Sequence, residues 1–366
     1  MLGSGGTRRA RHEQLKSICL QNGWEVTERV NNTIREGLFA LRPSLAVARQ
    51  LLVTVWQTIK FIPHMLRGRK RSLHLLFVYP APLQLVLLLP FSRMLRIPTI
   101  ADVYLSMFDT FVSDRKIRSS HHPVALLLRF FDKFVMELAD TIIVDTEENA
   151  DRYSEIFNIK RAKFLEIPVG ATTAFYENTT TAPAQVGETN VLFYGTFIPL
   201  HGAEVFCEAT QHEQLANFKF TFVGTGQTRA ACEAIAAHSP NVAFIDWLEI
   251  DDLVNEIDQA HIILGIAGVS EKALSVVPNK VFQSVVRKRL VATADSPAVN
   301  RILGNCVHTF AAGDVESLAQ TLIDIQHNYD TYIDQLEIHR NKLLHLISTE
   351  ALADRFANRL SDKAHD

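Results

Sequence analysis

The sequence has few cysteines, and their spacing excludes two kinds of small-domain architecture. The four cysteines, Cys19, Cys207, Cys232 and Cys306, stand singly, with neither a C-x-x-C pair nor a His-rich tract beside them. A disulfide framework or a structural zinc site needs paired or clustered cysteines. We therefore expect free thiols, which fits a reducing compartment such as the cytoplasm.

Long apolar runs are missing too. The longest extends over residues 73–89 and is interrupted by prolines and polar side chains, whereas a bilayer-spanning helix needs about 20 uninterrupted apolar residues. The first residues, M-L-G-S-G-G-T-R-R, lack the apolar core of a secretory signal. The sequence predicts neither a transmembrane segment nor a signal peptide.

Acidic residues are absent from one long region. None occurs in the 65 positions between Glu36 and Asp102, and residues 1–71 carry 13 Lys and Arg against 4 Asp and Glu. Within this region the segment from Ser44 to Arg71 mixes basic residues with the apolar runs L-L-V-T-V-W and F-I-P-H-M-L. Such a basic amphipathic segment is typical of a peripheral contact with a membrane surface. The alternative is a helix that packs one face on its own sheet and ends in a basic loop.

What the chain does have is an alternation of short β-branched runs and longer amphipathic segments, which predicts an α/β fold with parallel sheets. Its 366 residues exceed a typical domain, so we expect two, joined by the polar, aperiodic stretch at 176–190. The expected strands lie at 24–28, 73–79, 99–102, 141–145, 163–167, 191–194, 218–223, 242–246, 262–265, 290–293 and 307–310. The expected helices lie at 8–22, 44–66, 82–95, 123–138, 147–157, 202–210, 228–237, 250–257, 279–286, 298–303, 315–327 and 350–360.

Two glycine turns follow expected strands. In F-Y-G-T-F-I-P-L-H-G, Gly195 ends a strand and Gly202 opens a helix, and in F-V-G-T-G-Q, Gly224 and Gly226 follow the next strand. A unit of strand, glycine turn and helix brings backbone N–H groups and the positive end of the helix to a phosphate. Either turn alone is equally consistent with a tight turn that binds nothing. The two together favour a phosphate site.

The segment L-G-I-A-G-V-S-E-K-A-L-S-V-V-P-N-K-V-F-Q-S-V carries the candidate cations. Pro278 suits the first position of a helix, which would place Lys280 and Gln283 on one helix face, with Lys272 in the preceding loop. Two lysines beside the glycine turns would neutralise a diphosphate, and Gln283 would hydrogen-bond two vicinal hydroxyls of a ribose. The alternative for each lysine is a solvated surface charge.

The same segment, followed by V-A-T-A-D-S-P-A, resembles the donor-binding segment of group 1 (family four) GT-B glycosyltransferases, in the branch with a P-N-K-V-[YF]-[EQ] signature. Further stretches agree, namely A-D-T-I-I-V-D-T-E-E-N, I-P-V-G-A, F-Y-G-T-F-I-P-L-H-G and D-V-Y-L-S-M-F-D-T-F-V-S-D-R-K. The resemblance extends from about residue 3 to residue 360 and is most specific in the C-terminal half.

This resemblance implies two Rossmann-like domains that face each other across a cleft. It implies an acceptor-side domain over residues 1–180, a nucleotide-sugar-binding domain over 190–345 and a C-terminal helix over 346–366 that returns to the first domain. It also implies a retaining, metal-independent transferase that moves a hexose or related sugar from a nucleotide-diphosphate donor. The implied acceptor is a glycan or a polyprenyl-linked glycan in polysaccharide or glycoconjugate biosynthesis, at the cytoplasmic face of a membrane.

Carried over by position, the resemblance assigns Lys272 and Lys280 to the leaving diphosphate, Gln283 to the ribose and Asp102 to the acceptor or sugar. The further donor-site residues that it implies are Gly195, Thr196, Phe197, His201, Gly202, Gly224, Gly226, Trp247, Leu248 and Asn279. Trp247 and Leu248 would meet the base through their backbone. A capping or loop carboxylate is the alternative role for Asp102. No metal and no other cofactor is expected.

The sequence departs from the family pattern at two places. The common Glu-x7-Glu pair reads Ser275 and Gln283, and the lysine often found before the helix-opening glycine is His201. A neighbouring phosphate would raise the pKa of His201, or else the site relies on the two lysines alone.

Two rival functions stay open. One is a GT-B sugar-nucleotide 2-epimerase, which would need a catalytic carboxylate and histidine set that the sequence does not reveal. The other is a GT-B-like binding scaffold without turnover, which the departures at Ser275, Gln283 and His201 would suit. Nucleic-acid binding is not indicated, because no aromatic-interleaved basic face or known reader motif occurs.

Overall fold

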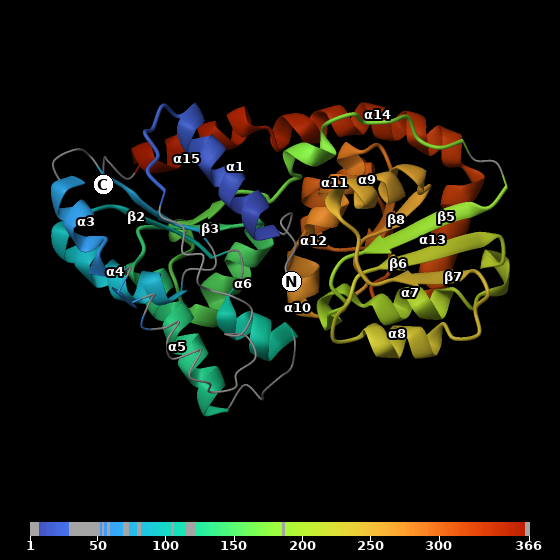
Figure 1. Cartoon of the computed structure of the whole chain (residues 1–366), viewed down its shortest axis with the longest axis horizontal. Helices are drawn as coiled ribbons and strands as arrows, with labels where there is room; N and C mark the ends of the chain where they lie inside the picture. Colours follow the sequence, from blue (N-terminus) through green and yellow to red (C-terminus); the bar gives the residue numbers. More distant parts are fainter. Residues whose placement is uncertain are drawn as a thin grey trace. The chain divides into compact units, whose positions relative to one another are not determined.

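The computed structural model describes residues 7–28, 52, 55–56, 59–68, 73–78, 82–103, 106–114, 122–184 and 187–362. Chain contacts divide it into two compact units (Figure 1). The first comprises Met1–Val112, Ile117–Ile167 and Ala353–Asp366, and the second comprises Ser113–Lys116 and Pro168–Leu352.

The first unit contains a parallel sheet in the order β1-β2-β3-β4. Its strands are β1 (Leu75–Phe77), β2 (Thr99–Asp102), β3 (Thr141–Val144) and β4 (Phe164–Glu166). Every residue of β2 and β3 is buried, as expected for parallel strands covered on both faces. Its helices are α1 (Thr7–Gln21), α3 (Ile62–Gly68), α4 (Pro82–Leu95), the π-helix η3 (Asp109–Asp114), α5 (Pro123–Leu138), α6 (Glu147–Phe157), the 3₁₀ turn η4 (Arg161–Lys163) and α15 (Thr349–Asp362).

The connections of this sheet place its helices. The chain moves one strand along at each step from β1 to β4, through α4, α5 and α6 in turn. Crossovers between parallel strands are right-handed, so these three helices cover the same face, and α4 packs along α5. The last helix, α15, returns to this unit: Phe356 is fully buried, its ring 5.6 Å from that of Trp24, and Asn22 Nδ2 donates to the carbonyl oxygen of Ala353 at 3.0 Å.

The second unit contains a parallel sheet in the order β10-β9-β8-β5-β6-β7. Its strands are β5 (Thr189–Tyr194), β6 (Phe218–Val223), β7 (Val242–Ile245), β8 (Ile262–Leu264), β9 (Leu290–Ala294) and β10 (His308–Phe310). From β5 the chain runs outward to β6 and β7, then crosses back to β8 and runs the other way. This is the doubly wound strand order 3-2-1-4-5-6, whose switch point lies between β5 and β8.

Helices cover both faces of this sheet (Figure 1). On one face lie α7 (Ala203–Ala209), α8 (Arg229–Ile235) and α13 (Val315–His327), and on the other lie α9 (Ile250–Gln259), α11 (Asn279–Val286) and α14 (Tyr329–Leu346). The shorter elements are α10 (Glu271–Ser275), α12 (Pro297–Ile302) and the 3₁₀ turns η5 (Thr173–Phe175), η6 (Pro199–His201), η7 (Glu213–Leu215) and η8 (Gly304–Cys306). Side-chain caps fix several helix starts, at Thr146, Ser270, Ser296 and Asp314.

The expected α/β fold with parallel sheets is confirmed, and several details differ. Residues 24–28 form no strand, and α10 and α14 were not expected. Residues after Pro168 group with the second unit, earlier than the boundary that composition suggests, because Arg287 donates to the backbone oxygens of Glu177 and Asn178. Lys272 lies in α10 rather than in a loop, and Pro278 caps α11 from the position before its first residue.

The basic segment between Ser44 and Arg71 lies largely outside the described residues. Of its expected helix, residues 52, 55, 56 and 59 are helical and α3 follows. Over the residues that the structure describes, no helix combines the length and apolarity needed to cross a bilayer. The four cysteines are all free and buried.

Candidate functional site

The loop after β5 lies at the switch point of the second sheet, where open parallel sheets bind ligands. Gly195 opens this loop with a φ of +139°. A β-carbon placed on Gly195 would stand 3.4 Å from Nζ of Lys280 and 3.5 Å from Cε1 of His201. The structure therefore brings three predicted residues, from the loop and from α11, to one point at the carboxyl edge of the sheet.

The second glycine turn packs directly on the first. Gly195 N donates to Val223 O at 2.9 Å, and Gly226 forms an isolated bridge with Phe197. A β-carbon on Gly224, whose φ is +133°, would overlap the carbonyl oxygen of Gly195. Only glycine leaves room for this approach, so the two turns form one backbone platform.

The loop after β8 completes the platform. Ala267 N donates to His201 O at 2.9 Å, and a β-carbon on Gly202 would stand 2.7 Å from the backbone nitrogen of Gly268. Since β5 and β8 flank the switch point, the loops that follow them meet where the helices diverge. Three backbone segments thus converge around Gly195.

Lys280 is the unusual side chain of this platform. It is 5% exposed, and its Nζ has no hydrogen-bond partner among the described residues. The ammonium lies 3.8 Å from the ring centre of Phe193, and burial lowers its pKa well below the ordinary value. A buried charge without a partner is costly, and an anionic ligand beside Gly195 would remove that cost.

His201 faces the same point in a neutral form. Its Nδ1 lies 2.6 Å from the backbone oxygen of Thr196, which can only accept, so Nδ1 carries the proton. Burial and the neighbouring Lys280 ammonium hold the pKa of His201 well below its ordinary value. Burial therefore disfavours the charged form of both side chains, and an anionic ligand at this point would favour it.

Asn279 and Gln283 lie on α11 with Lys280, and Lys272 lies on α10, which packs against the turn η6 that contains His201. Gln283 accepts a hydrogen bond from the Tyr194 hydroxyl at 3.1 Å, and Asn279 is the first residue of α11. Lys272 is buried in α10. Phe197 is fully buried, its N–H donates to Thr225 O at 3.0 Å and its carbonyl oxygen accepts from Thr228 N at 3.1 Å, so its contact with a ligand stays a prediction.

Trp247 and Leu248 lie farther along the same edge. They follow β7, two strands from β5 in the sheet, and Trp247 is 56% exposed. The structure describes no contact between them and the Gly195 turn, so their contact with a base stays a prediction.

Asp102 lies in the first unit, at the end of β2. Its side chain is fully buried, and Oδ1 pairs with Arg11 at 3.1 Å while Arg11 also donates to Ile167 O at 2.7 Å. Oδ2 is buried without a hydrogen-bond partner among the described residues. This ion pair ties α1 to the sheet, and a contact with acceptor or sugar stays a prediction.

The sequence analysis did not identify two residues that support the platform. Tyr194 is the last residue of β5. Its hydroxyl donates to Lys280 O at 3.0 Å and so joins the strand to the start of α11. Arg229 donates to Gly224 O and stacks on the rings of Phe197 and Phe244. In the sequence, only the position of Arg229 at the start of α8, just after the second glycine turn, indicated this role.

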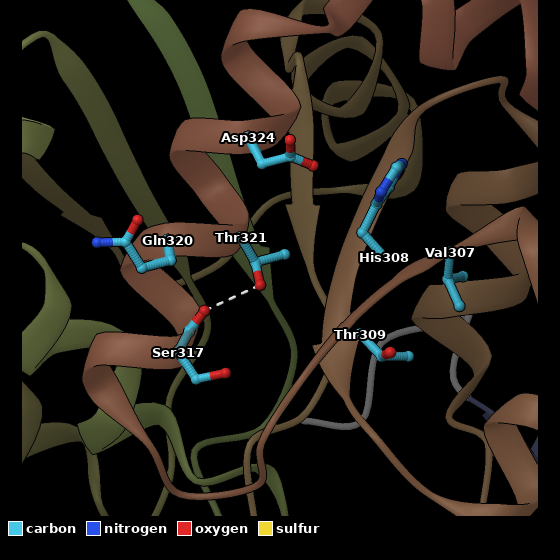
Figure 2. A pocket seen from close by; sticks show the side chains of 7 residues that line it. All are labelled: Val307, His308, Thr309, Ser317, Gln320, Thr321 and Asp324. Carbon is cyan, nitrogen blue, oxygen red and sulfur yellow. Dashed lines mark hydrogen bonds between the residues drawn. The ribbon is translucent and has the colours of Figure 1, made fainter.

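A hollow of about 470 Å³ lies elsewhere in this unit, between β10 and α13 (Figure 2). It is lined by Val307, His308, Thr309, Ser317, Gln320, Thr321 and Asp324. It touches the edge strand β10, three strands from β5. It is therefore separate from the platform at Gly195.

Solved structures share this architecture over most of their length. HepE from Anabaena, solved with UDP and glucose, matches with a TM-score of 0.64 over 99% of this chain and 97% of its own, at 11% identity. The chain has the GT-B fold. Sucrose-phosphate synthase from Thermosynechococcus elongatus matches this GT-B chain with a TM-score of 0.63, over 84% of this chain and 78% of its own, at 13% identity.

A glycosyltransferase from Rickettsia africae matches with a TM-score of 0.61, over 97% of this chain and 94% of its own, at 12% identity. At these identities the likeness is one of fold. No protein-family model and no curated protein matches the sequence.

Proposed function

We propose that this GT-B chain is a glycosyltransferase that uses a nucleotide-diphosphate sugar as donor. Support comes from structures of the same fold that were solved with such ligands, among them HepE with UDP-glucose. The observation that carries the proposal is the buried Lys280 ammonium, without a hydrogen-bond partner among the described residues, above the Gly195 platform. A diphosphate supplies the negative charge that this site lacks.

The proposed reaction separates charge. The bond between the anomeric carbon and the donor oxygen breaks with its electron pair going to the diphosphate, and an acceptor hydroxyl oxygen bonds to that carbon. The hydroxyl proton passes to the released diphosphate or to solvent. Preorganised cations and N–H dipoles stabilise such developing charge, and removing one donor typically costs about 10²–10³ in rate.

Each predicted residue has a role in this proposal. Lys280 and Lys272 counter the leaving diphosphate with the backbone N–H groups of the glycine turns, and Gln283 takes the ribose. Trp247 and Leu248 meet the base through their backbone. The proposal includes no metal and keeps the retaining stereochemistry that the resemblance implies.

The proposed acceptor is a glycan or a lipid-linked glycan. The argument for it is the acid-free, basic region of the first unit between Glu36 and Asp102, which suits a peripheral contact with an anionic surface. The transferred sugar is a hexose or a related sugar in this proposal.

A thermal-shift panel of nucleotide-diphosphate sugars tests donor binding. A ligand at 100 times its Kd should stabilise the protein by about 2.7 kcal/mol. We expect Lys280→Ala to lose this stabilisation, and Lys219→Ala, which removes an exposed lysine of β6 in the same unit, to keep it. Unchanged nucleotide affinity in Lys280→Ala would show that the phosphate assignment is wrong.

A radiolabelled donor then separates the rival functions. A transferase leaves the sugar nucleotide intact without an acceptor, moves label to the acceptor when one is present, and keeps this activity in EDTA. Interconversion of the sugar without acceptor would identify a 2-epimerase, and binding with neither reaction across a panel of acceptors would identify a scaffold.

A further inference from the structure

The Tyr194 hydroxyl is buried where β5 meets α11. Tyr194 is the last residue of β5, directly before Gly195, and it is 5% exposed. Burial raises the pKa of Tyr194 above its ordinary value, so the hydroxyl keeps its proton at neutral pH. A buried hydroxyl needs hydrogen-bond partners, and the partners of this one belong to α11.

Three oxygens of α11 lie within hydrogen-bond distance of this hydroxyl. They are Lys280 O at 3.0 Å, Gln283 Oε1 at 3.1 Å and Ser284 Oγ at 3.4 Å. Lys280 O also accepts from Ser284 Oγ at 2.6 Å. The only donor to Gln283 Oε1 among the described residues is Tyr194. The single hydroxyl proton is therefore shared between a helix carbonyl and the carboxamide of Gln283.

This contact orients the carboxamide of Gln283. A glutamine side chain has several rotatable bonds and presents either its oxygen or its amide nitrogen to a ligand. Here the oxygen is held by Tyr194, while the amide nitrogen Nε2 has no hydrogen-bond partner among the described residues. Gln283 is partly exposed and stands three positions after Lys280 on α11. It thus offers N–H donors beside the ammonium, where a glutamate could only accept.

We propose that Tyr194 is a positioning residue that fixes Gln283 for a ribose and so makes the site prefer ribonucleotides to 2′-deoxyribonucleotides. The proposal rests on the proposed function, in which Gln283 contacts the ribose hydroxyls. A polar group held in place for a hydroxyl rejects an analogue that lacks it, because the polar group is then left unpaired. Without the Tyr194 hydroxyl the carboxamide is free to rotate, and the preference for ribose should fall.

Isothermal titration calorimetry with nucleoside diphosphates measures this preference. The probes are UDP, GDP and ADP, each paired with its 2′-deoxy form. We expect the wild type to bind at least one ribonucleotide about tenfold or more tightly than its deoxy form. Tyr194→Phe, which removes only the hydroxyl, should lower this ratio to about threefold or less and change the affinity for the deoxy form by less than about twofold. A merely structural role would weaken both forms alike and leave the ratio unchanged.

Tyr329→Phe is the matched control. Its hydroxyl is also buried in the second unit, at the start of α14, but has no hydrogen-bond partner among the described residues. This variant should keep the ratio of the wild type. Thermal melting establishes that each variant is folded before the affinities are compared.

Gln283→Ala shows whether the hydroxyl acts through the carboxamide. This variant should lower the ratio as Tyr194→Phe does, and the double variant should lower it no further, since contacting residues that act as a unit are not additive. A double variant with a lower ratio than Gln283→Ala would mean that the hydroxyl acts without Gln283, and the proposal would be wrong.

The remaining outcomes separate this inference from the proposed function. A folded Tyr194→Phe with the ratio of the wild type would overturn the positioning role, as would a wild type that binds both forms of each nucleotide equally. Either result leaves nucleotide binding itself intact. Failure of the wild type to bind any of these nucleotides would overturn the proposed function together with the inference.

Discussion

Lys280 shows how a residue proposed to bind a ligand can work against stability. Its ammonium is buried beside a neutral histidine and over an aromatic ring, with no hydrogen-bond partner among the described residues. A buried, unsatisfied charged group costs at least about 1–3 kcal/mol. We infer that the unliganded protein carries this cost because the ligand removes it.

We therefore predict that Lys280→Met stabilises the unliganded protein and abolishes stabilisation by the donor. Methionine fills a similar volume without the charge, and each kcal/mol gained should raise the melting temperature by about 2–4 °C. Differential scanning calorimetry with and without UDP-glucose measures both effects, with Lys219→Met as the control. A lower melting temperature for unliganded Lys280→Met would contradict this account.

Donor affinity should also depend on pH. Burial lowers the pKa of Lys280 in the free protein, and a bound diphosphate favours the charged form and raises this pKa. Above the free-state pKa, binding must take up a proton, so affinity for UDP-glucose should fall by up to about tenfold per pH unit. Titration calorimetry in buffers of different ionisation enthalpy counts that proton, and a pH-independent affinity without proton uptake would contradict the prediction.

At the scale of elements, the glycine turns after β5 and β6 act as one unit. A β-carbon on Gly224 would overlap the carbonyl oxygen of Gly195, so the turns must separate if a side chain is added. We predict that Gly224→Ala weakens donor binding by at least tenfold and destabilises the fold by more than about 1 kcal/mol.

The matched control is Gly304→Ala. Gly304 also has a positive φ, of +49°, but a β-carbon there meets no atom within 4 Å. The Gly304→Ala variant should lose only about 1 kcal/mol of folding free energy, from the left-handed backbone conformation of the alanine. It should bind the donor with the affinity of the wild type. Isothermal titration with UDP-glucose compares the two variants, and equal affinity would mean that the contact between the turns is dispensable.

The local sequence pattern predicted most elements and part of the site. Buried β-branched runs and glycine turns are local signals, so β2, β6 and α11 lie where expected. The bond from Tyr194 to the backbone of Lys280 joins residues 86 positions apart, and Arg229 stacks on Phe197 of another loop, so a local sequence pattern does not indicate these contacts. The apolar alternation at 24–28 favoured a strand, but Trp24 there packs on α15 instead.

The contact between α5 and the residues just before η3 contains a second titratable group, Asp132 of α5. Asp132 accepts from Ser106 Oγ at 2.6 Å and from Phe108 N at 2.7 Å, and burial raises its pKa to about 6. The native state thus binds more protons than the unfolded state between about pH 4 and pH 6. Stability from this group is greatest below that window and falls as the pH rises through it.

We predict that Asp132→Asn, which keeps one acceptor oxygen, changes the pH dependence of stability. Relative to the wild type it should gain about 2–3 kcal/mol between pH 4 and pH 7, the equivalent of two pKa units. Urea denaturation at both pH values measures the difference, and a gap that does not change with pH would refute the raised pKa of Asp132.

At the scale of the whole molecule, the chain begins and ends in the same unit. Phe356 is fully buried against Trp24, and Arg355 pairs with Glu166. We predict that Phe356→Ala costs about 3–5 kcal/mol and that the loss appears in the first unit. Hydrogen exchange should quicken in α1 and in β4, while β5 and β6 keep their protection; faster exchange confined to the second unit would contradict the prediction.

This topology determines where chimeras with a related protein could be joined. Apart from Ser113–Lys116, the second unit is one continuous segment from Pro168 to Leu352, and most of the last helix, α15, belongs to the first unit although it follows that segment in the sequence. A single junction between the units would take α15 from a different parent than α1. Trp24 would then lose its contact with Phe356. A chimera that exchanges the second unit must therefore have a junction at each end of residues 168–352, so that α1 and α15 of the first unit come from the same parent.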